Sequence, residues 1–469
     1  MSAARGAAVF DLSAKRRVHV VGIGGPGMNA IATCLAQMGH DVSGSDIHES
    51  DVVERMRSLG IRVNIGHDPS VVDGCEAVTS STAIPMGNVE RARARETGIP
   101  DLGRADMLAA LCARRRSVAV AGTHGKTTTT SLLVRSLEVA GVDPSFVVGA
   151  DLLDEGTGAR WRDGEFLVVE ADESDGTHLK LPLAGTILTN IDRDHLDHYG
   201  DFAGLVAAFE EYLLGVVGPR VVCIDDPTIA GIVARHPNES WTTYGTSAAA
   251  DYRWSRVNAR DGVTTFVVDT PAATSIEVTS PLRGVHNVAN ATAVIAMVSA
   301  VGVDARWAVE AIATFGGVDR RFQIMAEVDG ITLVDDYAHL PREIDAVLTA
   351  ARASGDGWSR VVAVFQPNRF NRMAIMADEY GDAFGSADLV VLADIYASGT
   401  TPIAGVTGQL VVDAVRKRRP ELDVIYEPDR ALLATTVSGL LRSGDVCISM
   451  GCGDVETLPS EIVAVRGRR

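Results

Sequence analysis

The sequence feature that most constrains the fold is a short loop between an apolar run and an amphipathic segment. Residues 118–121 read Val-Ala-Val-Ala, which is typical of a buried strand, and the residues after Lys126 have apolar side chains at helical spacing. The loop between them reads Gly-Thr-His-Gly and leads into Lys126-Thr127. In phosphate-binding loops of this layout, backbone N–H groups bind phosphate, the lysine contacts the terminal phosphates and the hydroxyl ligates Mg²⁺. The sequence therefore predicts a nucleotide site in an α/β domain.

This loop departs from the general G-x-x-x-x-G-K-[ST] pattern, because position 120 is valine and the first glycine is Gly122. The alternative interpretation is a turn rich in Gly and Thr that binds nothing. It does not explain why a lysine directly follows Gly125, since the positive end of a helix dipole disfavours a cation. We therefore expect the nucleotide phosphates to contact the following residues: Gly122, Thr123, His124, Gly125, Lys126, Thr127 and Thr128.

Length and composition set the frame for this site. The chain has 469 residues, enough for three domains at about 150 residues each. Its net charge of −18 argues against a nucleic-acid partner, which requires a basic face, but one loop can still hold a nucleotide. The six cysteines form no C-x-x-C pair and are expected to be reduced thiols of a cytosolic protein. No apolar run of membrane-spanning length is present, and the first ten residues lack the apolar core of a signal peptide.

A second glycine motif lies near the N-terminus. A predicted strand at residues 18–21 runs into Gly22-x-Gly24-x-x-Gly27, and the next predicted strand ends at Asp46. This spacing is typical of a βαβ unit that binds a diphosphate at the helix N-terminus, with the acidic residue near a ribose. The alternative is that the glycines only allow a helix and a strand to pack closely. The motif does not identify the nucleotide.

An acidic run follows the predicted strand at residues 166–170. It contains Asp172, Glu173 and Asp175, at the carboxyl end of a strand, where open α/β sheets bind ligands. Carboxylates are ligands that Mg²⁺ prefers, although a solvated acidic turn is the alternative. The strand expected at 186–190 leads to His195, which either completes a metal site or is a surface histidine.

The remaining sequence predicts further α/β structure. Short alternating strands around residues 251–280 indicate an antiparallel edge, and Asn287 and Asn290 share one helix face, where they either cap the helix or contact an adenine. Beyond residue 319, helices are expected over residues 341–353, 371–385 and 407–418, and polar clusters follow three predicted strands. In one of these clusters, Arg369 and Arg372 could clamp a carboxylate. We expect an α/β chain with a Rossmann-like sheet in 1–114, a P-loop-type domain in 115–318 and a second Rossmann-like domain in 319–469.

Together these motifs resemble the Mur ligases over nearly the whole chain, from Val18 to about Val455. The opening Val-His-Val-Val-Gly-Ile-Gly-Gly-x-Gly-Met and the Gly44-Ser-Asp46 triplet resemble the alanine-adding branch of that family. The most specific segments are the Lys126 loop, the Glu170-Ala-Asp-Glu-Ser-Asp175 run, the segment from Thr189-Asn190 to Asp194-His195, His286-Asn287-x-x-Asn290 and Asp335-Asp-Tyr-Ala-His339. The short phosphate loop is this family's own form.

The resemblance implies a three-domain, ATP-dependent ligase of cytoplasmic peptidoglycan synthesis. Such an enzyme phosphorylates the carboxylate of UDP-N-acetylmuramate and lets the amine of L-alanine attack the acyl phosphate. ATP and Mg²⁺, with two ions, are the implied cofactors. The implied partners are these small molecules, with no nucleic acid and no membrane, and the sequence leaves a monomer or a homodimer open.

The resemblance also assigns roles to residues, domain by domain. The first domain would bind the UDP-sugar through Gly22, Gly24, Gly25, Gly27, Asp46 and His67. In the central domain, Lys126 would bind the β- and γ-phosphates, and the metal ligands would be Thr127, Glu173 and His195. The adenine and ribose would meet Asn287, Asn290 and Asp336. The incoming amino acid would meet Tyr337, His339, Arg369 and Arg372, with His195 or His339 as the general base.

Three departures from the family pattern and three rival interpretations remain. This chain has His339-Leu340-Pro341 where the family has His-His-Pro, Gln366-Pro-Asn368-Arg369-Phe370 where it has Gln-Pro-His-Arg-Tyr, and Gly284-Val-His286 where it has Gly-Arg-His. Two of these fall in the expected amino-acid pocket, so a relative that attaches a recycled tripeptide is an alternative. An NAD-linked dehydrogenase would leave the Lys126 loop without a role. A non-catalytic relative should have lost Lys126, Glu173 or His195.

Overall fold

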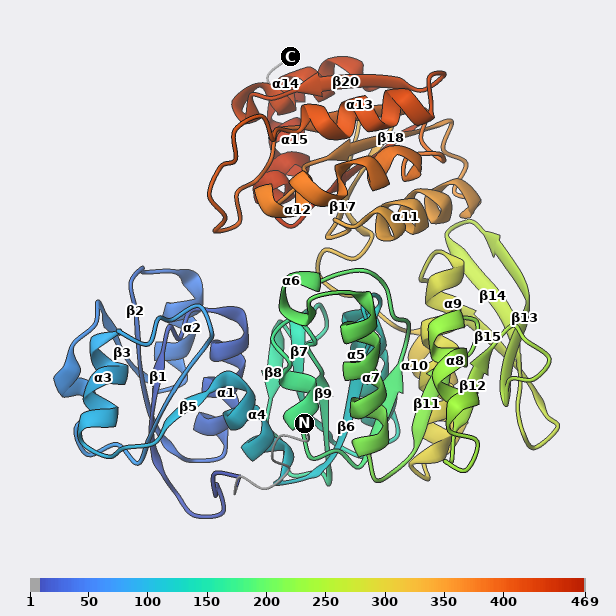
Figure 1. The fold of residues 1–469 in the computed structure, drawn as a ribbon. Coiled ribbons are helices and arrows are strands. Elements are labelled where there is room, and N and C mark those ends of the chain that lie inside the picture. Colours follow the sequence, from blue (N-terminus) through green and yellow to red (C-terminus); the bar gives the residue numbers. More distant parts are fainter. Residues whose placement is uncertain (1–8, 468–469) are drawn as a thin grey trace. The chain divides into compact units, whose positions relative to one another are not determined.

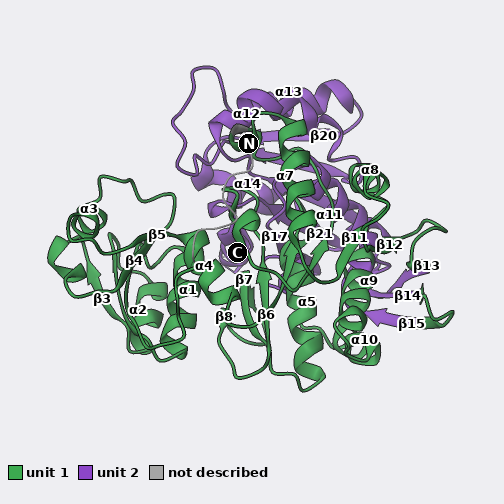
Figure 2. Cartoon of the chain, turned by 60° about the horizontal axis from the view of Figure 1, so that its bottom comes forward, with its two compact units in different colours: residues 1–255, 268–276, 289–316 green, residues 256–267, 277–288, 317–469 purple. Residues whose placement is uncertain are grey.

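The computed structural model describes residues 9–467, without the side chains of Pro26 and Asp197. The expectation about a leader in the first ten residues falls mostly on residues outside this range. Among the described helices, none is both long and apolar enough to span a bilayer. The chain divides into two compact units (Figure 2), which are described separately. The first unit holds the chain up to residue 255 with 268–276 and 289–316, and the second holds 256–267, 277–288 and 317 onward.

The first sheet of unit 1 is a five-stranded parallel sheet in the order β3-β2-β1-β4-β5. Its strands are β1 (Arg17–Val21), β2 (Asp41–Asp46), β3 (Arg62–Ile65), β4 (Ala77–Ser80) and β5 (Asp101–Gly103). Its helices are α1 (Pro26–Gln37), α2 (Asp51–Ser58), α3 (Val89–Glu96) and α4 (Arg104–Cys112). The chain reverses direction across this sheet at β1, so the carboxyl ends of β1 and β4 flank the crevice where doubly wound folds bind ligands.

The central sheet has ten strands in the order β15-β14-β13-β12-β11-β10-β6-β9-β7-β8 (Figure 1). Its first part comprises β6 (Arg116–Ala121), β7 (Ser145–Leu152), β8 (Thr157–Arg160), β9 (Phe166–Glu170), β10 (Gly185–Leu188) and β11 (Arg220–Cys223). The helices here are α5 (Lys126–Val139), α6 (Leu196–Tyr199), α7 (Phe202–Gly215), α8 (Pro227–Arg235), α9 (Val285–Ala300) and α10 (Ala305–Ala313). β6 pairs in parallel with β9 and β10, and residues 118–121 are buried, as expected for a central parallel strand.

The other end of this sheet confirms short strands in the 251–280 region. They are β13 (Tyr252–Arg260), β14 (Val263–Asp269) and β15 (Ser275–Ser280), and they follow β12 (Thr242–Gly245). Only two residues, Asp261 and Gly262, join β13 to β14. Strands joined by so short a loop run antiparallel, since a parallel connection needs a crossover.

The third sheet lies in unit 2 and has the order β16-β17-β21-β18-β19-β20. The edge strand β16 (Gln323–Val328) is antiparallel to β17 (Ile331–Asp336), and the remaining pairs are parallel: β18 (Arg360–Phe365), β19 (Leu389–Ala393), β20 (Asp423–Glu427) and β21 (Asp445–Met450). Alternate residues of β18 enter two different hydrophobic clusters, so both faces of the sheet are covered. The helices are α11 (Pro341–Ala353), α12 (Phe370–Met376), α13 (Gln409–Arg418), α14 (Arg430–Leu440) and α15 (Leu458–Arg466).

The expected helix over residues 371–385 is wrong in length. The α-helix ends at Met376, and a 3₁₀ helix over Ala377–Asp382 packs against α13. A Cβ atom on Gly381 would lie 2.5 Å from Arg418 Cγ, so this turn needs a glycine that also weakens a regular helix. The α/β class with three sheets is confirmed, whereas the domain boundaries 1–114, 115–318 and 319–469 stay a prediction.

Candidate functional site

The phosphate-type loop lies between β6 and α5, and its two glycines are required by its geometry. Gly122 has φ +126°, and a Cβ atom there would lie 2.2 Å from Thr189 Oγ1. Gly125 has φ +80° and directly precedes α5, and a Cβ atom there would lie 2.9 Å from Asn290 Oδ1. Only glycine adopts both conformations without strain. The loop is therefore a compact turn that leads directly into the N-terminus of α5.

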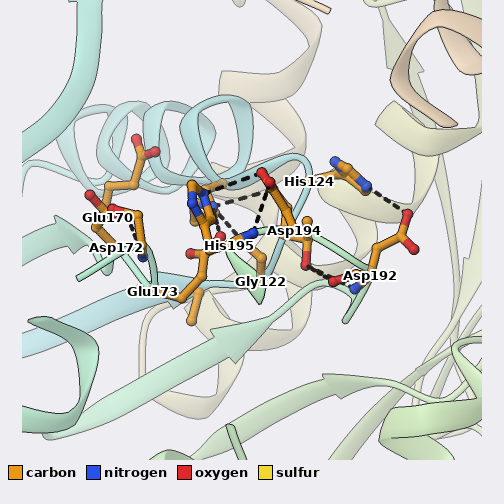
Figure 3. A network of polar contacts seen from close by, with 12 residues as sticks. Gly122, His124, Glu170, Asp172, Glu173, Asp192, Asp194 and His195 are labelled. Carbon is orange, nitrogen blue, oxygen red and sulfur yellow. Dashed lines mark hydrogen bonds and ion pairs between the residues drawn. The ribbon is translucent and has the colours of Figure 1, made fainter. Parts of the chain in front are cut away.

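The end of β10 holds this loop in place. Thr189 Oγ1 and Asn190 Nδ2 donate to the carbonyl oxygen of His124, at 2.7 and 3.0 Å, and Asn190 Oδ1 accepts from His124 N at 2.9 Å. The backbone N–H of Asp192 donates to Thr123 Oγ1, and His124 Nε2 lies 3.0 Å from Asp192 Oδ2 (Figure 3). The predicted phosphate ligands thus lie together: Gly122, Thr123, His124, Gly125, Lys126, Thr127 and Thr128.

Lys126 joins this loop to the acidic run. Its Nζ donates to the carbonyl oxygen of Gly122 at 2.7 Å and to Glu173 Oε1 at 2.9 Å. Burial lowers the pKa of Lys126, but Glu173, Glu170 and Asp172 outweigh it and raise the pKa. Burial raises the pKa of Glu173 to about 7 against the attraction of Lys126. Because three carboxylates favour the charged ammonium, Glu173 rather than Lys126 is the group that titrates.

The acidic side chains after β9 have different environments. Glu170 accepts from Thr127 Oγ1 at 3.2 Å and from Gly149 N at 2.9 Å. Glu173 is buried, and its Oε2 has no hydrogen-bond partner among the residues that the structure describes. A buried carboxylate oxygen without a partner is costly, and it fits a site that takes a further cation.

The predicted metal ligands are partly brought together. Thr127 Oγ1 and Glu173 belong to the loop and the acidic run that Lys126 joins, and they offer hard oxygen ligands. His195 Nε2 instead lies 3.2 Å from Asp194 Oδ2 (Figure 3). Within residues 9–467, no three His, Cys, Asp or Glu side chains form a metal-holding group. The oxygen donors of Thr127 and Glu173 are of the kind that Mg²⁺ takes, whereas the metal ligands and the ion count stay predictions.

The N-terminal glycine motif contacts the end of β2 and the side chain of Arg104. The backbone N–H of Gly24 donates to Asp46 Oδ2 at 2.8 Å. A Cβ atom on Gly27 would lie 2.9 Å from Arg104 Cδ. Gly22 and Gly25 complete the loop, whose backbone folds back so that Gly25 N donates to the Gly22 carbonyl oxygen. The backbone N–H of Gly22 also donates to the carbonyl oxygen of Ser45 in β2 at 2.8 Å, so the loop packs against that strand, and diphosphate binding at the loop stays a prediction.

In unit 2, the three predicted polar clusters meet at one edge of the sheet. The backbone N–H groups of Gly451 and Gln366 donate to the carbonyl oxygens of Asp336 and Met450, so the ends of β17, β21 and β18 are adjacent. Asp336 is buried, and its carboxylate accepts from Phe322 N and Ala338 N at 2.7 Å each. Burial raises the pKa of Asp336 to about 6. Asp336 therefore fastens the backbone, and its contact with a ribose stays a prediction.

The residues expected for the amino acid surround this edge. The rings of Tyr337 and His339 lie 5.4 Å apart, edge to face, and Arg372 Nη1 donates to Asn368 Oδ1 at 2.8 Å. Arg369 has φ +62° and precedes α12. Burial raises the pKa of Cys452, and nearby Arg372 and Arg369 oppose that shift, so the arginines lie close to the end of β21.

Two residues that depart from the family pattern, Leu340 and Asn368, are buried near this edge of the sheet. Leu340 is 3% exposed and packs in the core, and Asn368 is 2% exposed and accepts from Arg372. Of the two expected ATP residues on α9, Asn287 donates through Nδ2 to the carbonyl oxygen of Arg283. Asn290 lies against Gly125 in unit 1.

Comparison with known proteins gives the family of this chain. Three family models match in succession: "Mur ligase family, catalytic domain" at residues 17–116, "Mur ligase middle domain" at 120–298 and "Mur ligase, glutamate ligase domain" at 320–453. The chain belongs to the Mur ligase family. The predicted family resemblance is confirmed, and so is the three-domain α/β fold class.

Named relatives of this Mur ligase span its length. It is 40% identical to a UDP-N-acetylmuramate–L-alanine ligase of Agrobacterium fabrum over 96% of this chain and 98% of that one. It is 42% identical to the enzyme of that name from Acidothermus cellulolyticus, over 97% and 95%. The crystal structure of a UDP-N-acetylmuramate–alanine ligase from Thermotoga maritima aligns with a TM-score of 0.80 at 27% identity, covering 97% and 99%.

Sequence reasoning missed Glu90 in this Mur ligase. Glu90 is fully buried at the start of α3, accepts from Ser45 Oγ at 2.6 Å, and lies 3.2 Å from Nδ1 of His67, a predicted UDP-sugar ligand. Burial alone would raise the pKa of Glu90, but hydrogen bonds with His19 and Ser45 lower it. In the sequence, Glu90 is an ordinary acidic residue of a first helical turn, so no local signal marked it.

A second missed residue is Arg104. Its Nη2 donates to Asp172 Oδ2 and Asp175 Oδ2, at 2.9 Å each. The sequence places Arg104 at the start of a connecting helix, where a basic residue is unremarkable. The only available signal was the acidic run itself, which requires a cation from some other part of the chain.

Proposed function

We propose that this Mur ligase joins L-alanine to the carboxylate of UDP-N-acetylmuramate and converts ATP to ADP and phosphate. The observation that carries the proposal is the Lys126–Glu173 pair at a glycine phosphate loop, in a chain about 40% identical over nearly its whole length to alanine ligases of that name. The reaction serves peptidoglycan synthesis, and we place it in the cytoplasm because ATP and UDP-sugars are made there.

The chemistry follows from the weakness of a carboxylate as an acylating agent. Phosphorylation by ATP turns it into an acyl phosphate, and the neutral amine of L-alanine then attacks to give an amide and phosphate. Both steps bring anions together, so the ammonium of Lys126 and the N–H groups at the start of α5 offset charge. Thr127 and Glu173 would hold one Mg²⁺, and Glu173 with His195 a second, to neutralise further phosphate charge.

The other roles complete the proposal. The UDP-sugar lies at the glycine loop of residues 22–27 with Asp46 and His67. The adenosine part of ATP contacts Asn287, Asn290 and Asp336, and the amino acid contacts Tyr337, His339, Arg369 and Arg372. His195 and His339 are the two candidates for the general base. Each proposed domain binds one substrate: residues 1–114 bind the UDP-sugar, residues 115–318 bind ATP, and residues 319–469 bind the amino acid.

Phosphate release tests this proposal. The assay contains ATP, Mg²⁺ and UDP-N-acetylmuramate, with and without L-alanine, and release that requires both substrates supports an alanine ligase. Release driven by the L-Ala-D-Glu-diaminopimelate tripeptide but not by L-alanine would favour the recycling ligase, which Leu340 and Asn368 make the second candidate. Substrate-dependent change in nicotinamide absorbance would instead indicate a dehydrogenase.

A further inference from the structure

Arg104 connects the acidic run to the N-terminal sheet. It is the first residue of α4 and follows β5 directly. Its side chain is 20% exposed, and Nη2 donates to one carboxylate oxygen each of Asp172 and Asp175, with Thr177 Oγ1 at 3.4 Å. One guanidinium nitrogen therefore holds together both ends of the Asp172–Asp175 loop, which contains Glu173.

The other side of the same guanidinium faces the glycine motif. A Cβ atom on Gly27 would lie 2.9 Å from Arg104 Cδ and 3.2 Å from Arg104 Nη1. Gly27 is in the first turn of α1, whose N-terminus is the predicted place of the UDP-sugar diphosphate. Arginine has five N–H donors in a fixed planar arrangement, so carboxylates at one edge leave other donors for an anion.

Arg104 is linked to the nucleotide loop through the adjacent residues Asp172 and Glu173. Arg104 Nη2 donates to Asp172 Oδ2 at 2.9 Å, so the guanidinium holds the residue that directly precedes Glu173. Glu173, the next residue, pairs with Lys126 at 2.9 Å. A shift of Arg104 thus acts directly on the segment that contacts the phosphate-loop lysine.

We propose that Arg104 is a positioning residue that couples the UDP-sugar site energetically to the MgATP site. A diphosphate at the N-terminus of α1 fixes Arg104, and Arg104 fixes the Asp172–Asp175 loop in the arrangement that presents Glu173. Each ligand then strengthens binding of the other by the same factor, because equilibrium coupling is reciprocal. The inference rests on the proposed function for the identity of the two ligands.

Calorimetric titration tests this coupling. The dissociation constant of UDP-N-acetylmuramate is measured with and without Mg²⁺–adenylyl imidodiphosphate, for the wild type, Arg104→Met, Asp175→Asn and Lys180→Met. In the wild type we expect the nucleotide to tighten UDP-sugar binding about five-fold or more. Arg104→Met should bring the ratio to about one, and Asp175→Asn should reduce it while keeping the arginine.

Lys180→Met is the matched control. Lys180 Nζ pairs with Asp106 Oδ1 at 2.8 Å and so joins the same two segments as Arg104, but its side chain is 55% exposed. The control removes one positive charge from this contact and should keep the wild-type ratio. Arg104→Lys keeps the charge without the planar donors, so it should give an intermediate ratio.

The outcomes separate the two proposals. A wild-type ratio in both Arg104→Met and Asp175→Asn overturns the coupling role, and so does a wild-type enzyme whose ratio is one or below. If Arg104→Met does not fold in a thermal melt, Asp175→Asn decides alone. If the wild type binds the nucleotide but no UDP-N-acetylmuramate, the proposed function fails and the coupling role falls with it.

Discussion

Lys126 Nζ lies 2.9 Å from Glu173 Oε1 and 2.7 Å from the carbonyl oxygen of Gly122, so the phosphate-loop lysine is already held by protein oxygens. The same carboxylate has a second oxygen, Oε2, without a hydrogen-bond partner in the described part of the chain. Nucleotide phosphates would replace Glu173 as the partner of the Lys126 ammonium, and a cation would bind the Glu173 carboxylate. This pair therefore keeps both groups ordered until a nucleotide with its metal replaces each partner.

Replacing Lys126 by alanine should abolish ligation. We expect kcat to fall at least about 10²–10³-fold, the loss typical of one preorganised charge-stabilising group. Phosphate release with UDP-N-acetylmuramate and L-alanine measures it. Lys180→Ala, which removes an exposed lysine, is the control and should keep full activity. A Lys126→Ala enzyme with a tenth of wild-type activity would contradict the role.

Gly125→Ala should weaken nucleotide binding through two separate effects. The new residue must adopt φ +80°, which costs an L-residue roughly 1–2 kcal/mol, and its Cβ would meet Asn290 Oδ1. Gly141, just after α5, has φ +72° and open space around it. Gly141→Ala therefore carries the backbone strain without the clash.

Calorimetry with adenylyl imidodiphosphate and thermal melts separates these effects. Both variants should melt lower than the wild type, and only Gly125→Ala should lose nucleotide affinity, by about tenfold or roughly 1.4 kcal/mol. Equal affinities for the two variants would show that the loop tolerates a side chain and would remove the geometric argument for Gly125.

The phosphate loop could be predicted because its requirements are local. Glycines with positive φ, a lysine and a helix start lie within six residues, and the buried strand before them is a continuous apolar run. The α/β class follows from the same alternation of strands and helices, whereas the order of the strands in each sheet came only from the structure. In the third sheet, the predicted meeting of polar strand ends is confirmed, because parallel strands bring their carboxyl ends to one edge.

The missed residues are non-local. Arg104 meets Asp172 across 68 positions in sequence, and Glu90 meets Ser45 across 45. Neither spacing leaves a periodic signal, since the contact depends on how two elements pack. The split of the predicted 371–385 helix has the same origin: packing of Gly381 against α13 decides it, and that packing is invisible in the segment itself.

Glu90→Gln should raise the KM for UDP-N-acetylmuramate and leave the KM for ATP nearly unchanged. The carboxylate lies 3.2 Å from His67 Nδ1 and so orients the ring, and hydrogen bonds to a charged group contribute about 1.5–3 kcal/mol. We therefore expect an increase of about tenfold or more in that KM. Steady-state kinetics with each substrate varied in turn measures it.

Glu96→Gln provides the comparison for Glu90→Gln, because Glu96 is on the same helix but exposed. It should leave both KM values unchanged. If Glu90→Gln changes kcat alone, the side chain does not act through UDP-sugar binding, and the role assigned to the Glu90–His67 contact is wrong.

Asp336 should make the stability of the protein fall as pH rises from about 4 to 6. Burial raises its pKa from 3.8 to about 6, so in this range the folded state keeps a proton that the unfolded state has lost. The stabilisation is complete below pH 3.8 and is lost as pH passes about 6, in total roughly 3 kcal/mol at 1.36 kcal/mol per pKa unit.

Urea unfolding of the wild type and Asp336→Asn at pH 4.5, 5.5 and 7 measures this loss of stability. The variant cannot titrate at this position and loses one acceptor, for Phe322 N or Ala338 N, by the same amount at every pH. The wild type should therefore lose stability relative to Asp336→Asn as pH rises, and a constant difference between the two would show that Asp336 titrates normally.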